Sequence, residues 1–195
     1  MRLLSRNKIK EAANILNEGG ILAVPTETVY GLAVKIDNIS AINKLLDLKD
    51  RGIESGKVLT LMVPTVKDIE NYARLDRRSR NLAVRYFPGE LTMILPKSRL
   101  FKHPYFDNFR NIGIRIPDHD YMLKLLEETG PLLVTSANLR GEAPCLSAQE
   151  VSQRLPEVDA SVRGGCGRSL PSTILDLTEM HPRTIRQGGL LIVHY

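Results

Sequence analysis

The chain has 195 residues, of which 43% are hydrophobic and 25% are charged, and its formal net charge is +5 at pH 7. This length suits one domain with a buried core, over residues 1–195. No apolar run approaches the about 18 residues that a membrane span needs. Two cysteines and four histidines at scattered positions argue against a disulfide framework and predict no metal centre. Residues 1–8 lack the apolar core of a signal peptide, so we expect a cytoplasmic protein.

The predicted elements begin with a helix at residues 1–8, and apolar residues at helical spacing over 9–16 continue it until Gly19-Gly20. A short strand over 21–24 follows, ended by Pro25. Ser40 is the expected cap of a second helix that reaches residue 48. A strand over 58–63 precedes two short helices near 69–73 and 82–86, and Pro88-Gly89 breaks the second of them.

The second half of the chain predicts more strands than helices. Strands are expected over 91–95, 112–116, 132–135, 158–162, 173–177, 184–186 and 190–193. Helices are expected over 121–128 and after Ser147, where Ser147 and Glu150 have the form of a capping box. Residues 97–111 show little periodicity and predict a long loop, which could act as a lid. Because some late strands follow one another without a helix, an α/β fold with a mixed sheet is predicted.

Polar residues crowd the end of the first predicted strand, in the segment from Pro25 to Gly31. Thr26, Glu27, Thr28 and Tyr30 are costly to desolvate at the end of a buried strand unless they bind something. Strand ends are also where ligands lie in open α/β sheets. A polar turn that caps the next helix is an equally good interpretation of this segment alone.

The segment Lys49-Asp50-Arg51 follows the second predicted helix. Its two cations suit a triphosphate, because arginine forks onto oxygens and lysine supplies a compact charge. They could instead interact with the helix dipole. The chain lacks the glycine-rich motifs of the common nucleotide folds, so nucleotide binding would use scattered cations and polar groups at strand ends.

Two further segments place polar groups at the ends of predicted strands. Ser136 and Asn138 are separated by one small residue and could face one ligand or form an Asx-type turn. Ser136 has no His–Asp partner, so it is not interpreted as a nucleophile. Arg115 lies between two isoleucines; it must be paired if it points inward, whereas a solvent-facing arginine needs no partner.

Seven short segments together resemble the YrdC-like family, the threonylcarbamoyl-AMP synthases, in their short, single-domain bacterial form. In chain order they are Pro25-Thr26-Glu27-Thr28-Val29-Tyr30-Gly31, Lys49-Asp50-Arg51, Phe87-Pro88-Gly89-Glu90-Leu91-Thr92, Ile114-Arg115-Ile116-Pro117, Thr135-Ser136-Ala137-Asn138, Pro171-Ser172-Thr173-Ile174 and Ile185-Arg186-Gln187-Gly188. The resemblance implies one twisted mixed sheet flanked by helices around a deep basic cavity. It also implies a nucleotidyltransferase that makes L-threonylcarbamoyladenylate from L-threonine, bicarbonate and ATP with Mg²⁺, and releases pyrophosphate. A partner transferase would then modify tRNA.

The resemblance also implies roles for individual residues. Catalytic roles, with binding of the ATP phosphates, fall to Lys49 and Arg51. The threonine-binding residues would be Thr26, Arg115, Ser136 and Ser172, and the other nucleotide-binding residues would be Asn111, Asn138 and Arg186. Relatives commonly carry proline at the positions of Gly52 and Val58, and often threonine at the position of Asn111. No tightly bound cofactor and no resident metal are expected.

Two alternatives come from other functional classes. The positive net charge favours an anionic partner, nucleotide or RNA, so a non-enzymatic RNA-binding protein is one, with a basic stretch at Arg74, Arg77, Arg78 and Arg80. A solvated helix face is the favoured interpretation of that stretch, and with only 5% aromatic residues stacking surfaces are few. If the chain is the enzyme that the resemblance implies, we expect at most a weak contact with tRNA. The other alternative is the related carbamoyl-transfer module of hydrogenase maturation proteins, whose chains resemble this one but are much longer.

Overall fold

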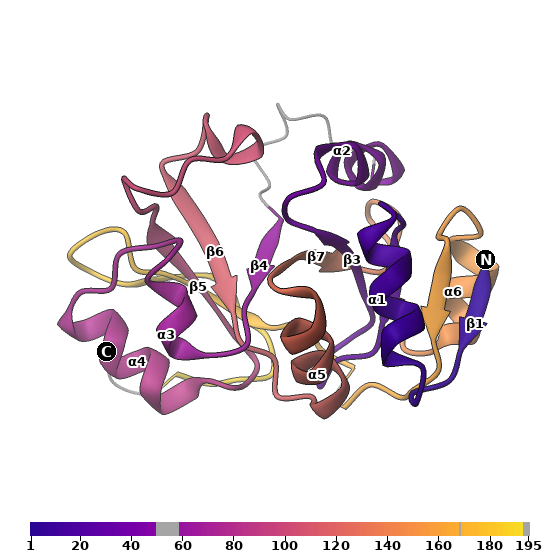
Figure 1. Ribbon diagram of the computed structural model, residues 1–195. Helices are drawn as coiled ribbons and strands as arrows, with labels where there is room; N and C mark the ends of the chain where they lie inside the picture. The colour runs from indigo at the N-terminus through magenta and orange to yellow at the C-terminus, as the bar shows by residue number, and fades with distance from the viewer. Residues whose placement is uncertain (50–58, 168, 193–195) are drawn as a thin grey trace.

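A single large sheet organises the computed structural model, which describes residues 1–49, 59–167 and 169–192 (Figure 1). In chain order the elements are β1 (Arg2–Leu4), α1 (Ile9–Asn17), β2 (Leu22–Val24), β3 (Gly31–Lys35), α2 (Ile39–Leu48), β4 (Thr60–Met62), α3 (Val66–Ile69), α4 (Arg77–Tyr86), β5 (Leu91–Pro96), the 3₁₀ helix η2 (Pro104–Phe106), β6 (Asn111–Arg115), α5 (Asp120–Thr129), β7 (Leu132–Ser136), α6 (Ala148–Arg154), β8 (Ala160–Val162), β9 (Thr173–Asp176) and β10 (Arg183–Arg186).

The strands within the described residues form one sheet in the order β1-β8-β2-β3-β7-β4-β6-β5-β9-β10. Parallel pairs join β8 to β1 and β2, β4 to β6, and β5 to β9. The other neighbours, such as β2 with β3 and β5 with β6, are antiparallel. The predicted α/β class with a mixed sheet and flanking helices is therefore confirmed.

Alternation of side chains along the strands builds two core clusters on opposite faces of the sheet. On β3, Leu32 and Val34 join the first cluster and Ala33 joins the second, and on β7 Leu133 joins the first while Leu132 and Val134 join the second. Helices α1 and α5, which lie side by side in Figure 1, fill the second cluster. The first cluster takes its helical residues from α2, α3, α4, α6 and η2.

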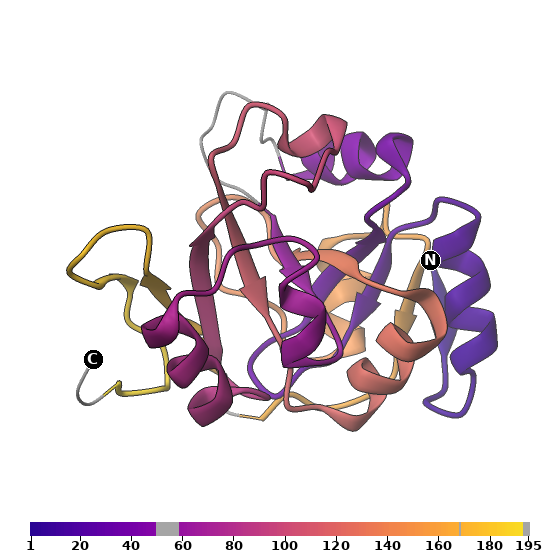
Figure 2. The ribbon, with the colours of Figure 1, turned by 60° about the vertical axis from the view of Figure 1, so that its left-hand side comes forward.

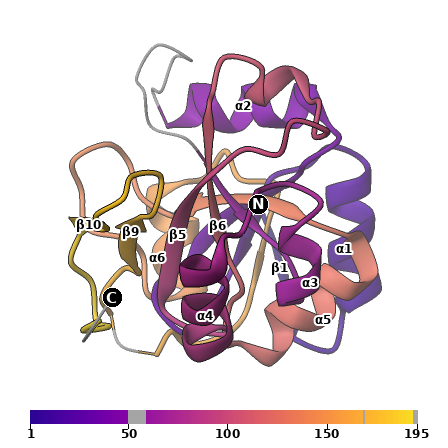
Figure 3. The same cartoon turned by 90° about the vertical axis from the view of Figure 1, so that its left-hand side faces the viewer.

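The ends of the sheet lie far apart. Figure 2 shows the β9–β10 hairpin at the left and β1 with α1 at the right. In the view of Figure 3, this hairpin lies to the left of β5 and β6, whereas α1 and α5 lie to the right. The late strands therefore extend the sheet beyond the helices that cover its second core cluster.

Most predicted elements are confirmed, but four local predictions are wrong. Residues 2–4 form β1 rather than part of a helix, because this short segment pairs with β8. Leu190 to Ile192 form no strand. Strand β3 was not predicted, because the segment from Pro25 to Gly31 was interpreted as a polar turn or a ligand site. Instead, a Cβ at Gly31 would lie 2.7 Å from Val134 Cγ1, so glycine permits close packing of β3 on β7. Asn38 rather than Ser40 caps α2, by accepting from the Ala41 N–H at 2.9 Å.

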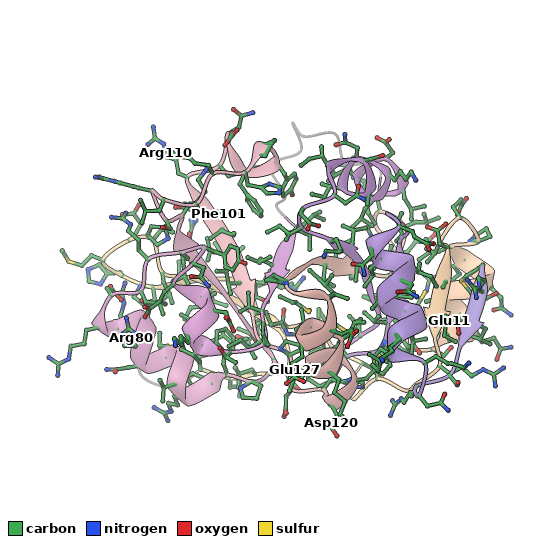
Figure 4. All side chains as sticks on the ribbon, viewed as in Figure 1. Glu11, Arg80, Phe101, Arg110, Asp120 and Glu127 are labelled. Carbon is green, nitrogen blue, oxygen red and sulfur yellow. The ribbon has the colours of Figure 1, made fainter. Side chains whose placement is uncertain are left out.

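The predicted loop over 97–111 is ordered around aromatic side chains. It contains η2, which lies beside α2 in Figure 2. Phe101 packs edge-on against Tyr72 with ring centroids 5.0 Å apart, and its ring lies beneath the loop in Figure 4. His103 Nε2 lies 2.7 Å from the carbonyl oxygen of Ile36. These contacts attach the loop to the first core cluster, and its action as a lid stays a prediction.

Asp76 caps the N-terminus of α4. Its Oδ1 accepts hydrogen bonds from the Ser79 N–H at 2.7 Å and from Ser79 Oγ at 2.6 Å. The hydrogen bonds from the Ser79 hydroxyl and N–H hold the pKa of Asp76 below its ordinary value. Because the folded-state pKa is lowered, the stabilisation is fully present above the ordinary aspartate pKa of about 3.9 and is lost as the pH falls through the folded-state value.

We therefore expect Asp76→Ala to lower the free energy of unfolding by about 1 kcal/mol at neutral pH, the usual loss for a helix cap. The difference from the wild type should shrink as the pH falls below about 3.9. Urea unfolding at a series of pH values measures this difference, with Glu127→Ala, at an exposed position of α5 (Figure 4), as the control. A loss that is the same at every pH would contradict the assignment.

Within residues 1–49, 59–167 and 169–192, no helix is both long enough and apolar enough to cross a membrane.

Candidate active site

A cavity of about 780 Å³ lies on the face of the sheet that is opposite to the first core cluster. Strand periodicity explains its lining. On β5, Thr92 and Ile94 face the cavity while Met93 lies in the core, and on β6 the cavity takes Gly113 and Arg115. Alternate residues of β4 and β7 continue the same wall: Thr60, Met62, Val134 and Ser136.

Segments distant in sequence complete the cavity. Thr26 and Thr28 come from the turn after β2, and residues 108–110 come from the loop over 97–111. Ser172 and Arg186 come from the two sides of the β9–β10 hairpin. Among the described lining residues the cations are Arg110, Arg115 and Arg186, and the acid is Asp176. That the cavity is deep and basic stays a prediction.

Arg115 points inward and is paired, with only 5% of its surface exposed. Its Nη2 donates to Glu27 Oε1 at 2.8 Å and to Thr28 Oγ1 at 2.9 Å, and its Nε donates to the Gly89 carbonyl oxygen at 3.2 Å. Glu27 Oε1 also accepts from the Asp118 N–H at 2.9 Å. The prediction that an inward Arg115 needs a partner is confirmed, and the solvent-facing alternative is wrong.

The threonines of the turn after β2 bond to one another rather than capping a helix. Thr26 Oγ1 lies 2.9 Å from Thr28 Oγ1 and donates to the Val29 carbonyl oxygen at 2.6 Å. The segment leads into β3 instead of a helix. The alternative of a helix-capping turn is therefore wrong, and the two hydroxyls face the cavity.

Ser172 and Arg186 form a second polar group in the cavity. Arg186 Nη2 donates to Ser172 Oγ and its Nε to the Ser172 carbonyl oxygen, both at 3.0 Å. Ser172 Oγ also lies 2.8 Å from Thr92 Oγ1. Desolvation in the cavity, and then the positive charge of Arg115, lower the pKa of Arg186. The two guanidinium groups therefore act on one volume, which suits an anionic ligand.

Gly188 lets the chain after β10 pack close to the backbone of Ser172. A Cβ at Gly188 would lie 2.1 Å from the Pro171 carbonyl oxygen. Only glycine allows the segment after β10 to pass this close to the backbone before Ser172, and its N–H donates to Thr173 Oγ1 at 3.0 Å.

Ser136, Asn138 and Lys49 form a third group at the end of β7. Lys49 ends α2 and is 1% exposed. Its Nζ donates to the Ser136 carbonyl oxygen at 2.9 Å, to Asn138 Oδ1 at 2.8 Å and to the Asn138 carbonyl oxygen. Ser136 Oγ donates to Asn138 Oδ1 at 2.6 Å. Lys49 thus holds the turn that carries Ser136.

The structure brings six of the predicted site residues into one cavity: Thr26, Asn111, Arg115, Ser136, Ser172 and Arg186. Lys49 and Asn138 lie directly behind Ser136 and do not line this cavity. Arg51, Gly52 and Val58 lie outside the described residues. The ligand roles of these residues stay predictions.

Comparisons with known proteins identify the family of this chain. The family model described as telomere recombination, that of the Sua5, YciO and YrdC proteins, matches residues 14–188. The chain belongs to the Sua5/YciO/YrdC family. It is 34% identical to the threonylcarbamoyl-AMP synthase of Vibrio campbellii over 185 residues, which cover 92% of this chain and 98% of that protein.

Solved structures of the Sua5/YciO/YrdC family share the fold. P. abyssi Sua5 complexed with L-threonine matches with a TM-score of 0.89 and 30% identity, over 97% of this chain and 58% of that one. E. coli YciO matches with a TM-score of 0.87 and 27% identity, over 96% of this chain and 95% of that one. The chain also spans 54% of the length of the Pyrococcus abyssi threonylcarbamoyl-AMP synthase, to which it is 33% identical.

Three residues at the site of this Sua5/YciO/YrdC chain were given no individual role by the sequence: Glu27, Thr28 and Thr92. Each of these residues lies within one of the seven segments that resemble the family, so the sequence motifs included them. Their contacts are with Arg115 and Ser172, which are 80 or more positions away. Sequence spacing could not pair them.

Within the described ranges, no group of three or more His, Cys, Asp and Glu residues could hold a metal ion. In the basic stretch, Arg78 donates to the carbonyl oxygens of Glu179 and Met180, and Arg80, at the surface in Figure 4, pairs with Glu70. These contacts fit the predicted solvated helix face.

Proposed function

We propose that this chain synthesises L-threonylcarbamoyladenylate from L-threonine, bicarbonate and ATP, with release of pyrophosphate, for the threonylcarbamoyladenosine modification of tRNA. The observation that carries the proposal is the convergence of Thr26, Arg115, Ser136, Ser172 and Arg186, from five separate segments, on one cavity. The fold alone would not carry it, because E. coli YciO shares the fold under a name that states no activity.

Different residues would bind the amino acid and the nucleotide. Arg115, with the hydroxyls of Thr26, Ser136 and Ser172, would orient L-threonine through its carboxylate and polar groups. Arg186 and Asn111 in the cavity, with Asn138 behind Ser136, would hold the nucleotide.

Charge develops on the leaving pyrophosphate when the adenylate forms. Lys49 and Arg51 would stabilise that charge. Three acceptors of the Lys49 ammonium belong to the turn of Ser136 and Asn138. A phosphate oxygen would therefore replace one of these hydrogen bonds. Positioning and electrostatics would supply most of the catalysis, as in phosphoryl transfer.

The reaction would also involve a metal ion, a partner enzyme and tRNA. Mg²⁺ would arrive with the triphosphate. Nucleotidyltransferase is the reaction class, and a tRNA-modifying transferase in the cytoplasm would consume the product. A weak tRNA contact completes the proposal.

The test measures pyrophosphate release with ATP, bicarbonate and each amino acid in turn. We expect release with L-threonine, little with L-serine or L-valine, and none when bicarbonate is removed. Equal release with all three amino acids would contradict the substrate assignment. Binding to RNA that falls steeply with salt and ignores ATP and threonine would favour the non-enzymatic alternative.

A further inference from the structure

Glu27 lies behind the cavity wall. Its neighbours Thr26 and Thr28 line the cavity, but Glu27 does not, and its side chain is 13% exposed. Oε1 is anchored by Arg115 Nη2 at 2.8 Å and by the Asp118 N–H at 2.9 Å. The carboxylate is thus fixed by backbone on one side and holds the guanidinium on the other.

The hydrogen bonds of Arg115 leave one end of its guanidinium for a ligand. Of the five N–H groups that a guanidinium carries, two on Nη2 donate to Glu27 and Thr28, and the one on Nε donates to the Gly89 carbonyl oxygen. No described residue accepts from Nη1. Because Arg115 lines the cavity, Nη1 is the group that can meet a carboxylate there.

Glu27 occupies this position at a cost in free energy. Its second oxygen, Oε2, is buried and has no hydrogen-bond partner among the described residues. A buried acceptor without a donor is destabilising, so the fold alone does not explain a carboxylate here. Its negative charge pairs with Arg115, and desolvation, followed by the charge of Arg115, lowers the pKa of Arg186 across the same cavity.

We propose that Glu27 is a positioning residue for the amino-acid substrate. Its carboxylate holds the guanidinium of Arg115 from behind, so that Nη1 points to the substrate carboxylate. This inference rests on the proposed function, since it concerns the L-threonine subsite.

The experiment compares Glu27→Gln with the wild type by calorimetric titration of L-threonine and, separately, of ATP. We expect the Kd for L-threonine to rise about 10-fold to 100-fold, the order of one charge-assisted hydrogen bond, because a guanidinium that is held less firmly meets the substrate carboxylate less well. The Kd for ATP should change less than about 3-fold, because the contacts of Arg186 with Ser172 remain. Glu11→Gln is the matched control, since Glu11 pairs with Arg2 on the exposed face of α1, away from the cavity (Figure 4).

A second readout needs no substrate. In ¹⁵N-edited NMR spectra of the wild type, the two Nη groups of Arg115 should give separate signals because rotation of the guanidinium is hindered. In Glu27→Gln they should exchange faster. If the wild type binds no L-threonine, the proposed function fails, and the NMR comparison still decides whether Glu27 positions Arg115.

Two results would overturn the inference. One is an unchanged Kd for L-threonine in a folded Glu27→Gln variant, even with lower thermal stability, because this would show a merely structural role. The other is unchanged rotation of the guanidinium. If Glu27→Gln does not fold, Glu27→Asp replaces it, since the shorter side chain keeps the charge but cannot reach both Arg115 and the Asp118 N–H. Wild-type affinity of Glu27→Asp for L-threonine would equally overturn the inference.

Discussion

Replacing Lys49 by methionine should lower ATP-dependent pyrophosphate release about 100-fold to 1000-fold, as for the loss of one preorganised donor in an active site. The methionine keeps the length of the buried stem but removes the ammonium that binds Ser136 and Asn138. The turn would lose its donor, and the leaving phosphates would lose a charge. Steady-state kinetics with saturating ATP and L-threonine measures the loss.

The same substitution should lower the free energy of unfolding by about 1–3 kcal/mol, since partly buried carbonyl oxygens lose their donor. Lys44→Met is the control, because Lys44 is exposed on the same helix α2. Circular dichroism and urea unfolding separate loss of fold from loss of chemistry. Wild-type turnover in a folded Lys49→Met variant would remove Lys49 from the proposed mechanism.

Arg115→Met should have the second large effect, on both stability and substrate binding. The free energy of unfolding should fall by about 3–5 kcal/mol, because the carboxylate of Glu27 is left in a buried site without its cation. The Kd for L-threonine should rise at least about 100-fold, since the cavity loses the group that meets the carboxylate. Urea unfolding and calorimetry measure the two effects.

A double variant separates these effects. Arg115→Met combined with Glu27→Gln removes both charges of the buried pair, and such paired removal is often close to neutral for stability. We therefore expect most of the lost stability to return, while affinity for L-threonine stays low. Recovery of both properties, or of neither, would contradict the separate roles given to Glu27 and Arg115.

Local pattern was enough to predict most elements of this fold. The alternation around Ile112 and Ile114 and the helical spacing of Ala12, Ala13 and Leu16 are properties of neighbouring residues. The predicted helices and strands that follow from such patterns are confirmed to within a few residues. β1 and β3 were not predicted, because β1 is a short segment that pairs with the distant β8 and β3 begins at a glycine whose role depends on Val134.

The candidate site shows the same division. The residue types indicated the chemistry of the site. Its cations can bind phosphate and carboxylate, its hydroxyls can orient a substrate, and Ser136 has no base to activate it. The contacts needed the folded chain. The phosphate role of Lys49 stays a prediction, whereas its hydrogen bonds to the turn of Ser136 and Asn138 were found only in the structure.

The sequence by itself determined most of the strands and helices and which polar residues are available at their ends, because these depend mainly on a few neighbouring residues. Only the tertiary structure decided that β4 lies between β7 and β6 and that β9 lies beside β5. Strand order depends on contacts between residues far apart in the chain, and these form only when the two core clusters close. That order brings Arg115, Ser136 and Ser172 to one cavity.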